Sequence, residues 1–170
     1  MRSRIMMLMA VTADGKIARG GDHFPDWTGS PDKRMFKALT MRAGVVIMGA
    51  RTFDSLGGPL PGRKHVVLTR HPGRRQPVAG VSFTSDEPDR IAAGLYREGY
   101  SQAVLAGGAV ANSLFAGAGL IDEIILTVSP RLFGQGPGLF DTILDMELTL
   151  EDCHRIDTDT VCLKYKVVSS

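Results

Sequence analysis

The segment MGARTFDSLGGPLPGRKHVVLTR, from Met48 to Arg70, contains the strongest structural signals in the sequence. It begins at the end of an apolar, β-branched run, 45–48, and closes on a second such run, 65–69. Between them, Gly49 to Thr52 indicate a strand end that turns into a helix, with a cation and a hydroxyl at the turn. Two buried strands of this kind are typical of a parallel sheet covered by helices.

The same alternation extends outward from this segment in both directions. Further apolar runs bounded by turns predict strands at Ile5–Val11, Gln102–Ala106 and Ile124–Val128. Helical patterns lie between the runs, at Pro31–Arg42 with Ser30 as N-cap, at Asp86–Glu98 from a Ser-capped turn, and at Ala109–Ala116.

The pattern changes after Val128, where positions 129–140 are loop-like and rich in glycine. The segments Glu147–Glu151 and Val161–Val167 then predict a closing antiparallel hairpin. We expect an α/β fold, a three-layer α/β/α sandwich with a mainly parallel sheet and an antiparallel C-terminal hairpin. Neither a repeat nor a low-complexity linker divides residues 1–170, so the sequence predicts a single domain.

Composition excludes several classes of protein. The chain has 170 residues, a formal charge of +2 and 44% hydrophobic residues, which is globular and far less basic than a nucleic-acid-binding protein. The apolar stretch Ile5–Val11 is too short for a signal peptide or a membrane span, so we expect a cytoplasmic protein without membrane or nucleic-acid partners. Cys153 and Cys162 are expected to be free and mostly buried thiols.

Other common chemistries find no support in the motifs. The dinucleotide fingerprint G-x-G-x-x-G is absent, which argues against a standard Rossmann dehydrogenase. Neither Ser55 nor Ser113 has the G-x-S-x-G setting of a hydrolase. No metal site is expected, because no metal-ligand spacing relates the histidines, which are His23, His65, His71 and His154.

A second strand-glycine-helix turn complements the one at Gly49. Here the run 102–106 passes through Gly107 and Gly108 into a helix that starts at Ala109 and Val110. Backbone N–H groups at helix N-termini hold phosphates, and glycine permits close approach. Two such turns at the carboxyl ends of parallel strands indicate one crevice that binds a nucleotide cofactor.

The segment from Met48 to Arg70 closely resembles bacterial dihydrofolate reductases without a gap, and its PLPGR core is fairly specific. The resemblance implies that Gly49 and Thr52 hold the cofactor pyrophosphate, with Arg51 substituting for the arginine that the family usually has at the position of Ala50. It further implies that the strand end Leu68, Thr69 and Arg70 lies near the adenosine 2′-phosphate, and that Arg63 pairs with a folate carboxylate. Arg70, together with Arg74 and Arg75, forms a cluster that suits the extra phosphate of NADPH.

Upstream of this segment, Trp27 precedes Asp32 by five positions, as in the reductase family. By resemblance, Asp32 is the substrate-binding acid, Phe36 stacks on the substrate and Thr40 is the polar residue of that helix. Asp32 could share a proton with a pterin amide and a bound water, and so promote protonation of the imine nitrogen. The alternative is that Asp32 only interacts with the helix dipole.

Other motifs resemble a second branch of the same fold, the reductase domain of riboflavin-pathway deaminase-reductases. The segment T-A-D-G-K-I-A that contains Asp14 resembles its entrance, and W-x-x-S-P-x-x-R supplies Ser30 and Arg34, which in that branch help to bind a ribose phosphate. The Gly107–Gly108 pair and the segment from Pro130 to Gly134 also match this branch.

These resemblances lead to three functional hypotheses. The leading one is hydride transfer from NADPH to a ribosylamino-pyrimidine phosphate, with Asp14, Trp27, Ser30, Asp32 and Arg34 around the substrate. The second is dihydrofolate reduction, in which Asp32 assists protonation and Arg63 binds a carboxylate. The third is a catalytically silent nucleotide-binding or drug-sequestering protein. The riboflavin branch is commonly dimeric, and the apolar segment from Ile143 to Leu150 offers an interface, so we expect a homodimer.

Overall fold

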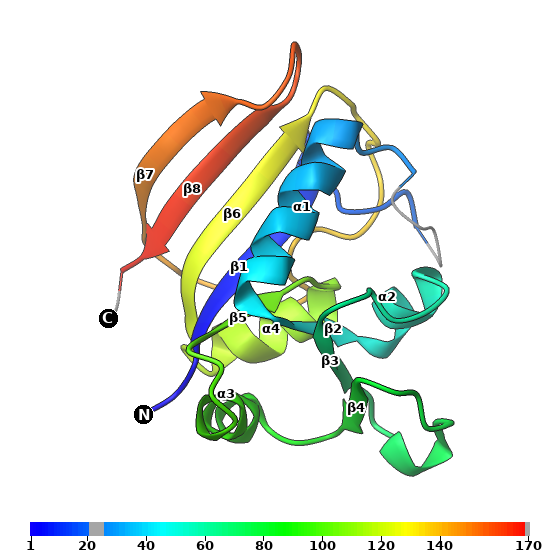
Figure 1. The fold of residues 1–170 in the computed structure, drawn as a ribbon. Coiled ribbons are helices and arrows are strands. Elements are labelled where there is room, and N and C mark those ends of the chain that lie inside the picture. The colour runs from blue at the N-terminus through cyan, green and yellow to red at the C-terminus, as the bar shows by residue number, and fades with distance from the viewer. Residues whose placement is uncertain (21–25, 169–170) are drawn as a thin grey trace.

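The computed structural model describes residues 1–20 and 26–168. It contains an eight-stranded sheet in the order β4-β3-β2-β5-β1-β6-β8-β7, with helices on both faces (Figure 1). The predicted three-layer α/β/α architecture is confirmed.

Six neighbouring strands of the sheet run parallel. They are β1 (Arg4–Thr12), β2 (Val45–Gly49), β3 (Lys64–Leu68), β4 (Val81–Thr84), β5 (Gln102–Leu105) and β6 (Ile121–Ser129). Their inner residues are largely buried because helices cover both faces, which explains the continuous apolar runs in the sequence. Strand β4 was not predicted, because it is four residues long and only partly buried at the edge of the sheet.

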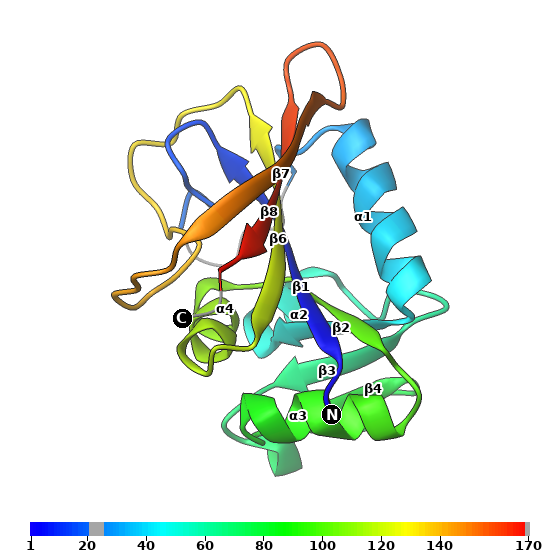
Figure 2. The ribbon, with the colours of Figure 1, turned by 90° about the vertical axis from the view of Figure 1, so that its left-hand side faces the viewer.

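Among residues 1–20 and 26–168, two helices cover each face of the sheet. One layer holds α1 (Ser30–Ala43) and the short α2 (Ala50–Ser55), and the other holds α3 (Pro88–Arg97) and α4 (Ala109–Gly117). The view in Figure 2 separates α1 from α4, which lie on opposite sides of the sheet. A 3-10 turn, Pro72–Arg74, follows β3.

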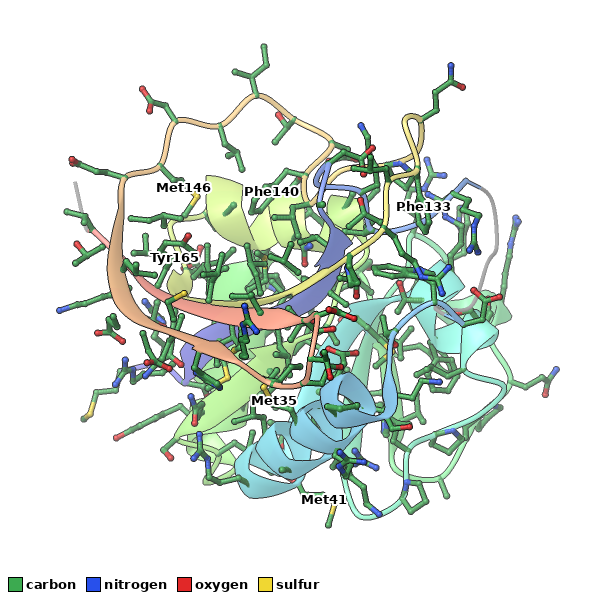
Figure 3. The ribbon with its side chains drawn as sticks, turned by 90° about the horizontal axis from the view of Figure 1, so that it is seen from above. Met35, Met41, Phe133, Phe140, Met146 and Tyr165 are labelled. Carbon is green, nitrogen blue, oxygen red and sulfur yellow. The ribbon has the colours of Figure 1, made fainter. Side chains whose placement is uncertain are left out.

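Alternate side chains of β1 pack into the two hydrophobic cores, one on each face of the sheet. Ile5 and Met7 are buried toward α3 and α4, whereas Met6 and Leu8 are buried toward α1. This is the period of two expected for a strand between two apolar layers. Figure 3 shows the same separation farther along the sheet, where Phe140, Met146 and Tyr165 lie on the α4 side and Met35 lies on the α1 side.

The chain closes with the antiparallel strands β8 (Val161–Val167) and β7 (Leu148–Arg155). All eight residues of β7 are exposed on this edge strand. Cys153 is opposite Leu163 and Cys162 is opposite His154, so the two thiols point to opposite faces of the hairpin. Both cysteines are free, but Cys153 is exposed, which corrects the expectation of two mostly buried thiols.

Two predicted helix caps are wrong. Gly29 is the N-cap of α1, and Ser30 is its first residue, with no side-chain hydrogen bond that caps the helix. Helix α3 starts at Pro88 after Glu87, two residues later than predicted, and no serine caps it. In both cases a proline in the first turn supplies the starting geometry without a side-chain cap.

Candidate functional site

A pocket of about 710 Å³ opens at the carboxyl ends of β1, β2 and β5. Its walls come from the loop after β1, from α1, from α2 and the turn that follows it, and from the start of α4. In open α/β sheets, ligands usually bind outside the carboxyl ends of the strands, at the point where the strand order reverses. Ten of the predicted site residues line this pocket, namely Trp27, Asp32, Phe36, Gly49, Arg51, Thr52, Arg63, Gly108, Ala109 and Val110.

The two glycine turns come together as the sequence predicted. Gly49 is the N-cap of α2 and Gly108 is the N-cap of α4, and the Gly49 N–H donates to the Gly107 carbonyl at 2.8 Å. A Cβ atom added to Gly49 would lie 3.9 Å from the Gly108 nitrogen, and one added to Gly108 would lie 3.5 Å from Thr52 Oγ1. Side chains at the two glycines would therefore fill the space between the helix N-termini, a cradle that suits the phosphates of a dinucleotide.

The end of β3 lies beside this cradle. Leu68 is the register partner of Gly49, so Thr69 and Arg70 leave the sheet next to it, although none of the three lines the pocket. Arg70 is exposed, as is Arg74. Arg75 is different, because it forms an ion pair with Asp54 and lies over the Phe83 ring at 4.9 Å.

Asp32 occupies the first turn of α1 and lines the pocket. Its Oδ1 atom accepts a hydrogen bond from Thr127 Oγ1 on β6 at 2.5 Å. A carboxylate has about four acceptor positions, so a ligand can also donate to Asp32 while Thr127 holds it. Trp27 and Phe36, which precede and follow Asp32 in the sequence, add apolar side chains to the pocket lining, and Trp27 is 6% exposed.

Arg63 is held in the pocket wall by two hydrogen bonds. Its Nη1 atom donates to Thr40 Oγ1 at 2.8 Å, and its Nε atom donates to the Pro61 carbonyl at 3.0 Å. Thr40 is buried and itself donates to the Phe36 carbonyl. Partial burial lowers the pKa of Arg63 from its ordinary value, which still leaves an arginine charged.

The lining of the pocket is positively charged overall. Lys33 and Lys37 on α1 join Arg51 and Arg63, and Asp32 is the single carboxylate among the described residues of the lining. A positive field in a concave site attracts anionic ligands. The pocket therefore suits a ligand that carries phosphates, carboxylates or both.

Asp14 has a different environment from the substrate contact that we predicted. Its carboxylate accepts hydrogen bonds from Thr12 Oγ1 at 2.5 Å and from the backbone N–H groups of Phe133 and Gly134, the latter at 2.7 Å. These bonds lower its pKa to about 2, with the Thr12 hydroxyl as the largest cause. Asp14 does not line the pocket, but it joins the loop after β1 to the loop after β6.

The two residues proposed for a ribose phosphate also lie elsewhere. Ser30 and Arg34 are exposed on α1 and do not line the pocket. Gly107 is buried, and its carbonyl accepts a hydrogen bond from the Gly49 N–H. These three positions, with Asp14 and the β3 end, are the predicted site residues that the structure leaves outside the pocket lining.

Sequence reasoning missed Thr127, Lys33 and Lys37. Thr127 is separated from Asp32 by 95 positions and meets it only because β6 lies under α1, so no local signal connects them. The lysines had a weak signal, because Lys33 and Lys37 follow the spacing of one helix face.

The described part of the chain contains no helix that is long and apolar enough to cross a membrane. It contains no group of three or more His, Cys, Asp or Glu side chains arranged to hold a metal ion. His23 lies outside the described residues.

Known proteins with related sequences include dihydrofolate reductases. Dihydrofolate reductase type 3 of Salmonella typhimurium is 44% identical over 68 residues, which are 40% of this chain and 41% of the relative. Dihydrofolate reductase type 8 of Escherichia coli is 34% identical over 151 residues, 85% of this chain and 82% of the relative. The chain thus matches less than half the length of the first relative and most of the second.

Solved structures with the same fold include both branches. A putative riboflavin biosynthesis protein from Shewanella superposes with a TM-score of 0.77 and 22% identity over 98% of this chain and 99% of that chain. Dihydrofolate reductase from Enterococcus faecalis, complexed with NADP(H), superposes with a TM-score of 0.74 and 23% identity over 98% of this chain and 97% of the other. These likenesses support the fold of both branches equally.

The family is decided by the sequence match over the region that builds the pocket. The family model for dihydrofolate reductase matches residues 4–144, from the first strand through the loop after β6. That range contains every residue that lines the pocket. This chain belongs to the dihydrofolate reductase family.

Proposed function

We propose that this protein is an NADPH-dependent reductase of a pterin substrate that ends in a carboxylate, with dihydrofolate as the best candidate. The observation that carries the proposal is that Asp32 and Arg63, a carboxylate and a guanidinium for the two ends of such a substrate, line the same pocket. Both are held there by buried threonine hydroxyls, those of Thr127 and Thr40. The curated relatives, which are named dihydrofolate reductases, support the same assignment.

The cofactor cradle supports NADPH. Gly108 would hold the pyrophosphate through its backbone N–H and Thr52 through its hydroxyl, Gly49 would leave room for the phosphates, and Arg51 would add charge. Arg70, which leaves the sheet beside the cradle, would meet the 2′-phosphate that distinguishes NADPH from NADH. When bound, the dihydronicotinamide supplies the hydride.

Asp32 would bind and orient the pterin ring. A carboxylate accepts hydrogen bonds from an amine and a ring N–H of the substrate, while Thr127 fixes its orientation. An acid at this place would also raise the basicity of the neighbouring substrate nitrogen, so that a proton reaches it from water. Trp27 and Phe36 would exclude bulk water from the ring.

Arg63 would bind the carboxylate tail. A guanidinium has five N–H donors, and two of them are used by Thr40 and Pro61, which leaves three for a ligand. Because Thr40 and Pro61 fix the plane of the group, a bidentate pair with a carboxylate would cost little further side-chain entropy.

This proposal reverses the order of the hypotheses drawn from the sequence. Reduction of a ribosylamino-pyrimidine phosphate relied on Ser30 and Arg34, and both lie outside the pocket lining. It is retained as the second candidate because Lys33 and Lys37 add two cations to the pocket wall, where a phosphate could bind.

Steady-state oxidation of NADPH with each substrate tests the proposal. We expect turnover with dihydrofolate and little or none with the ribosylamino-pyrimidine phosphate. Asp32→Asn provides the control, since it should remove the activity while cofactor binding remains. Faster turnover of the pyrimidine would support the second candidate, and cofactor binding without turnover of either substrate would support a catalytically silent protein.

A further inference from the structure

His65 is a buried side chain that the proposed function does not use. It lies near the start of β3, is 0% exposed and packs edge-on against Phe53 of α2, with ring centroids 6.0 Å apart. Its Nε2 atom accepts a hydrogen bond from the Leu60 N–H at 3.0 Å. The ring is therefore neutral with its proton on Nδ1, because an accepting Nε2 atom carries no hydrogen.

Packing alone does not explain a histidine at this position. Among the described residues, Nδ1 has no hydrogen-bond partner of normal geometry. An apolar side chain of similar size would fill the same volume without leaving a buried polar atom unsatisfied. What such a side chain would lack is the acceptor for the Leu60 N–H.

The Leu60 contact lies at the base of the turn that presents Arg63. Leu60 lines the pocket, and the next residue, Pro61, offers its carbonyl to Arg63 Nε. Gly62 completes the turn with a φ of +74°, which an L side chain rarely adopts. Any movement of Leu60 would shift the Pro61 carbonyl, which is one of the two groups that orient the guanidinium.

From this geometry we infer that His65 is a positioning residue for substrate binding: its Nε2 atom anchors Leu60 and thereby sets the orientation of Arg63 toward a carboxylate tail. The identity of the ligand in this inference rests on the proposed function. The contact between His65 and Leu60 is independent of that function. His65 does not itself line the pocket, and its side-chain hydrogen bond goes to Leu60, so the effect of losing that bond should fall on the tail of the substrate.

Two substitutions separate anchoring from packing. His65→Leu removes the acceptor and keeps an apolar side chain, whereas His65→Gln places an amide oxygen near the position of Nε2 and restores the acceptor. His71 is exposed, and His71→Leu serves as the matched control for loss of a histidine.

The experiment combines amide exchange with kinetics on two substrates. We expect His65→Leu to speed hydrogen exchange at the Leu60 amide by roughly 5-fold, the equivalent of one net hydrogen bond. The KM for dihydrofolate should rise by about 5- to 10-fold with little change in kcat, and the KM for dihydrobiopterin, which has no carboxylate, should stay the same. His65→Gln should restore both values, and His71→Leu should alter neither.

The inference is overturned if His65→Leu leaves the KM for dihydrofolate unchanged, or raises the KM for both substrates equally. It is also overturned if His65→Leu and His65→Gln behave alike, because packing would then be the whole role. If the unmodified protein reduces neither substrate, the proposed function fails. In that case the Leu60 amide exchange alone tests the anchoring role, and an exchange rate that is the same in the unmodified protein and in His65→Leu would overturn it.

Discussion

Replacing Arg63 by alanine should decide which anionic group the substrate presents. Three of its five N–H donors remain for a ligand after the bonds to Thr40 and Pro61 are counted. Two of these donors suffice for a bidentate carboxylate, and losing the net equivalent of one hydrogen bond to a charged group costs about 1.5–3 kcal/mol. We therefore expect Arg63→Ala to raise the KM for dihydrofolate by about 10- to 150-fold.

The structure also predicts what Arg63→Ala leaves unchanged. The Thr40 hydroxyl keeps its bond to the Phe36 carbonyl, so the free energy of unfolding should fall by only about 1 kcal/mol. Because the tail lies away from the reacting ring, kcat should change little, which is the signature of lost uniform binding. Arg63→Lys should recover part of the affinity, since it keeps the charge but not the planar pair of donors.

Arg34→Ala is the matched control, because it also removes an arginine, but from an exposed position of α1 that does not line the pocket. Steady-state kinetics with dihydrofolate and with the ribosylamino-pyrimidine phosphate, together with thermal unfolding, measure all three effects. The reasoning is refuted if Arg34→Ala impairs turnover more than Arg63→Ala does and the pyrimidine is the better substrate. That result would return the ribose-phosphate hypothesis to first place.

Three further predictions concern the cofactor, the acid and the pH dependence of stability. Arg70→Ala should weaken NADPH binding by about 10- to 150-fold in a fluorescence titration and leave NADH nearly unchanged, since a single charge-assisted contact is lost; equal losses for both would contradict the assignment. Asp32→Asn should cost less than about 1 kcal/mol of stability but about 100-fold or more in kcat, and an unchanged kcat would remove Asp32 from the mechanism. The pKa of His65 is lowered from its ordinary value of 6.5, mainly by burial and then by the charge of Arg63. The Arg63 and Gly80 carbonyls have a smaller, opposite effect. The unfolded chain then binds a proton that the folded chain does not bind, so the free energy of unfolding should fall as the pH drops from about 6.5 to about 5.5. Chemical denaturation at the two pH values measures this loss, which should be absent in His65→Gln; an identical loss in that variant would assign it to other groups.

The sequence determined the layers of the fold and the glycine turns of the site. Apolar runs such as 45–48 and 103–105 are buried on both faces of the sheet, so their hydrophobicity is continuous and visible without a structure. Gly49 and Gly108 stand directly after such strands, and parallel strands end on the same edge. The sequence alone therefore indicated the crevice.

Only the tertiary structure decided which charged side chains share that crevice. Arg34 and Lys33 are neighbours in one helix, yet Lys33 lines the pocket and Arg34 does not, because successive helical residues point about 100° apart. Thr127 reaches Asp32, and Asp14 reaches Gly134, across about a hundred positions or more of chain. Contacts of this kind depend on the order of strands in the sheet and on the packing of α1 over β6, which local sequence patterns do not encode.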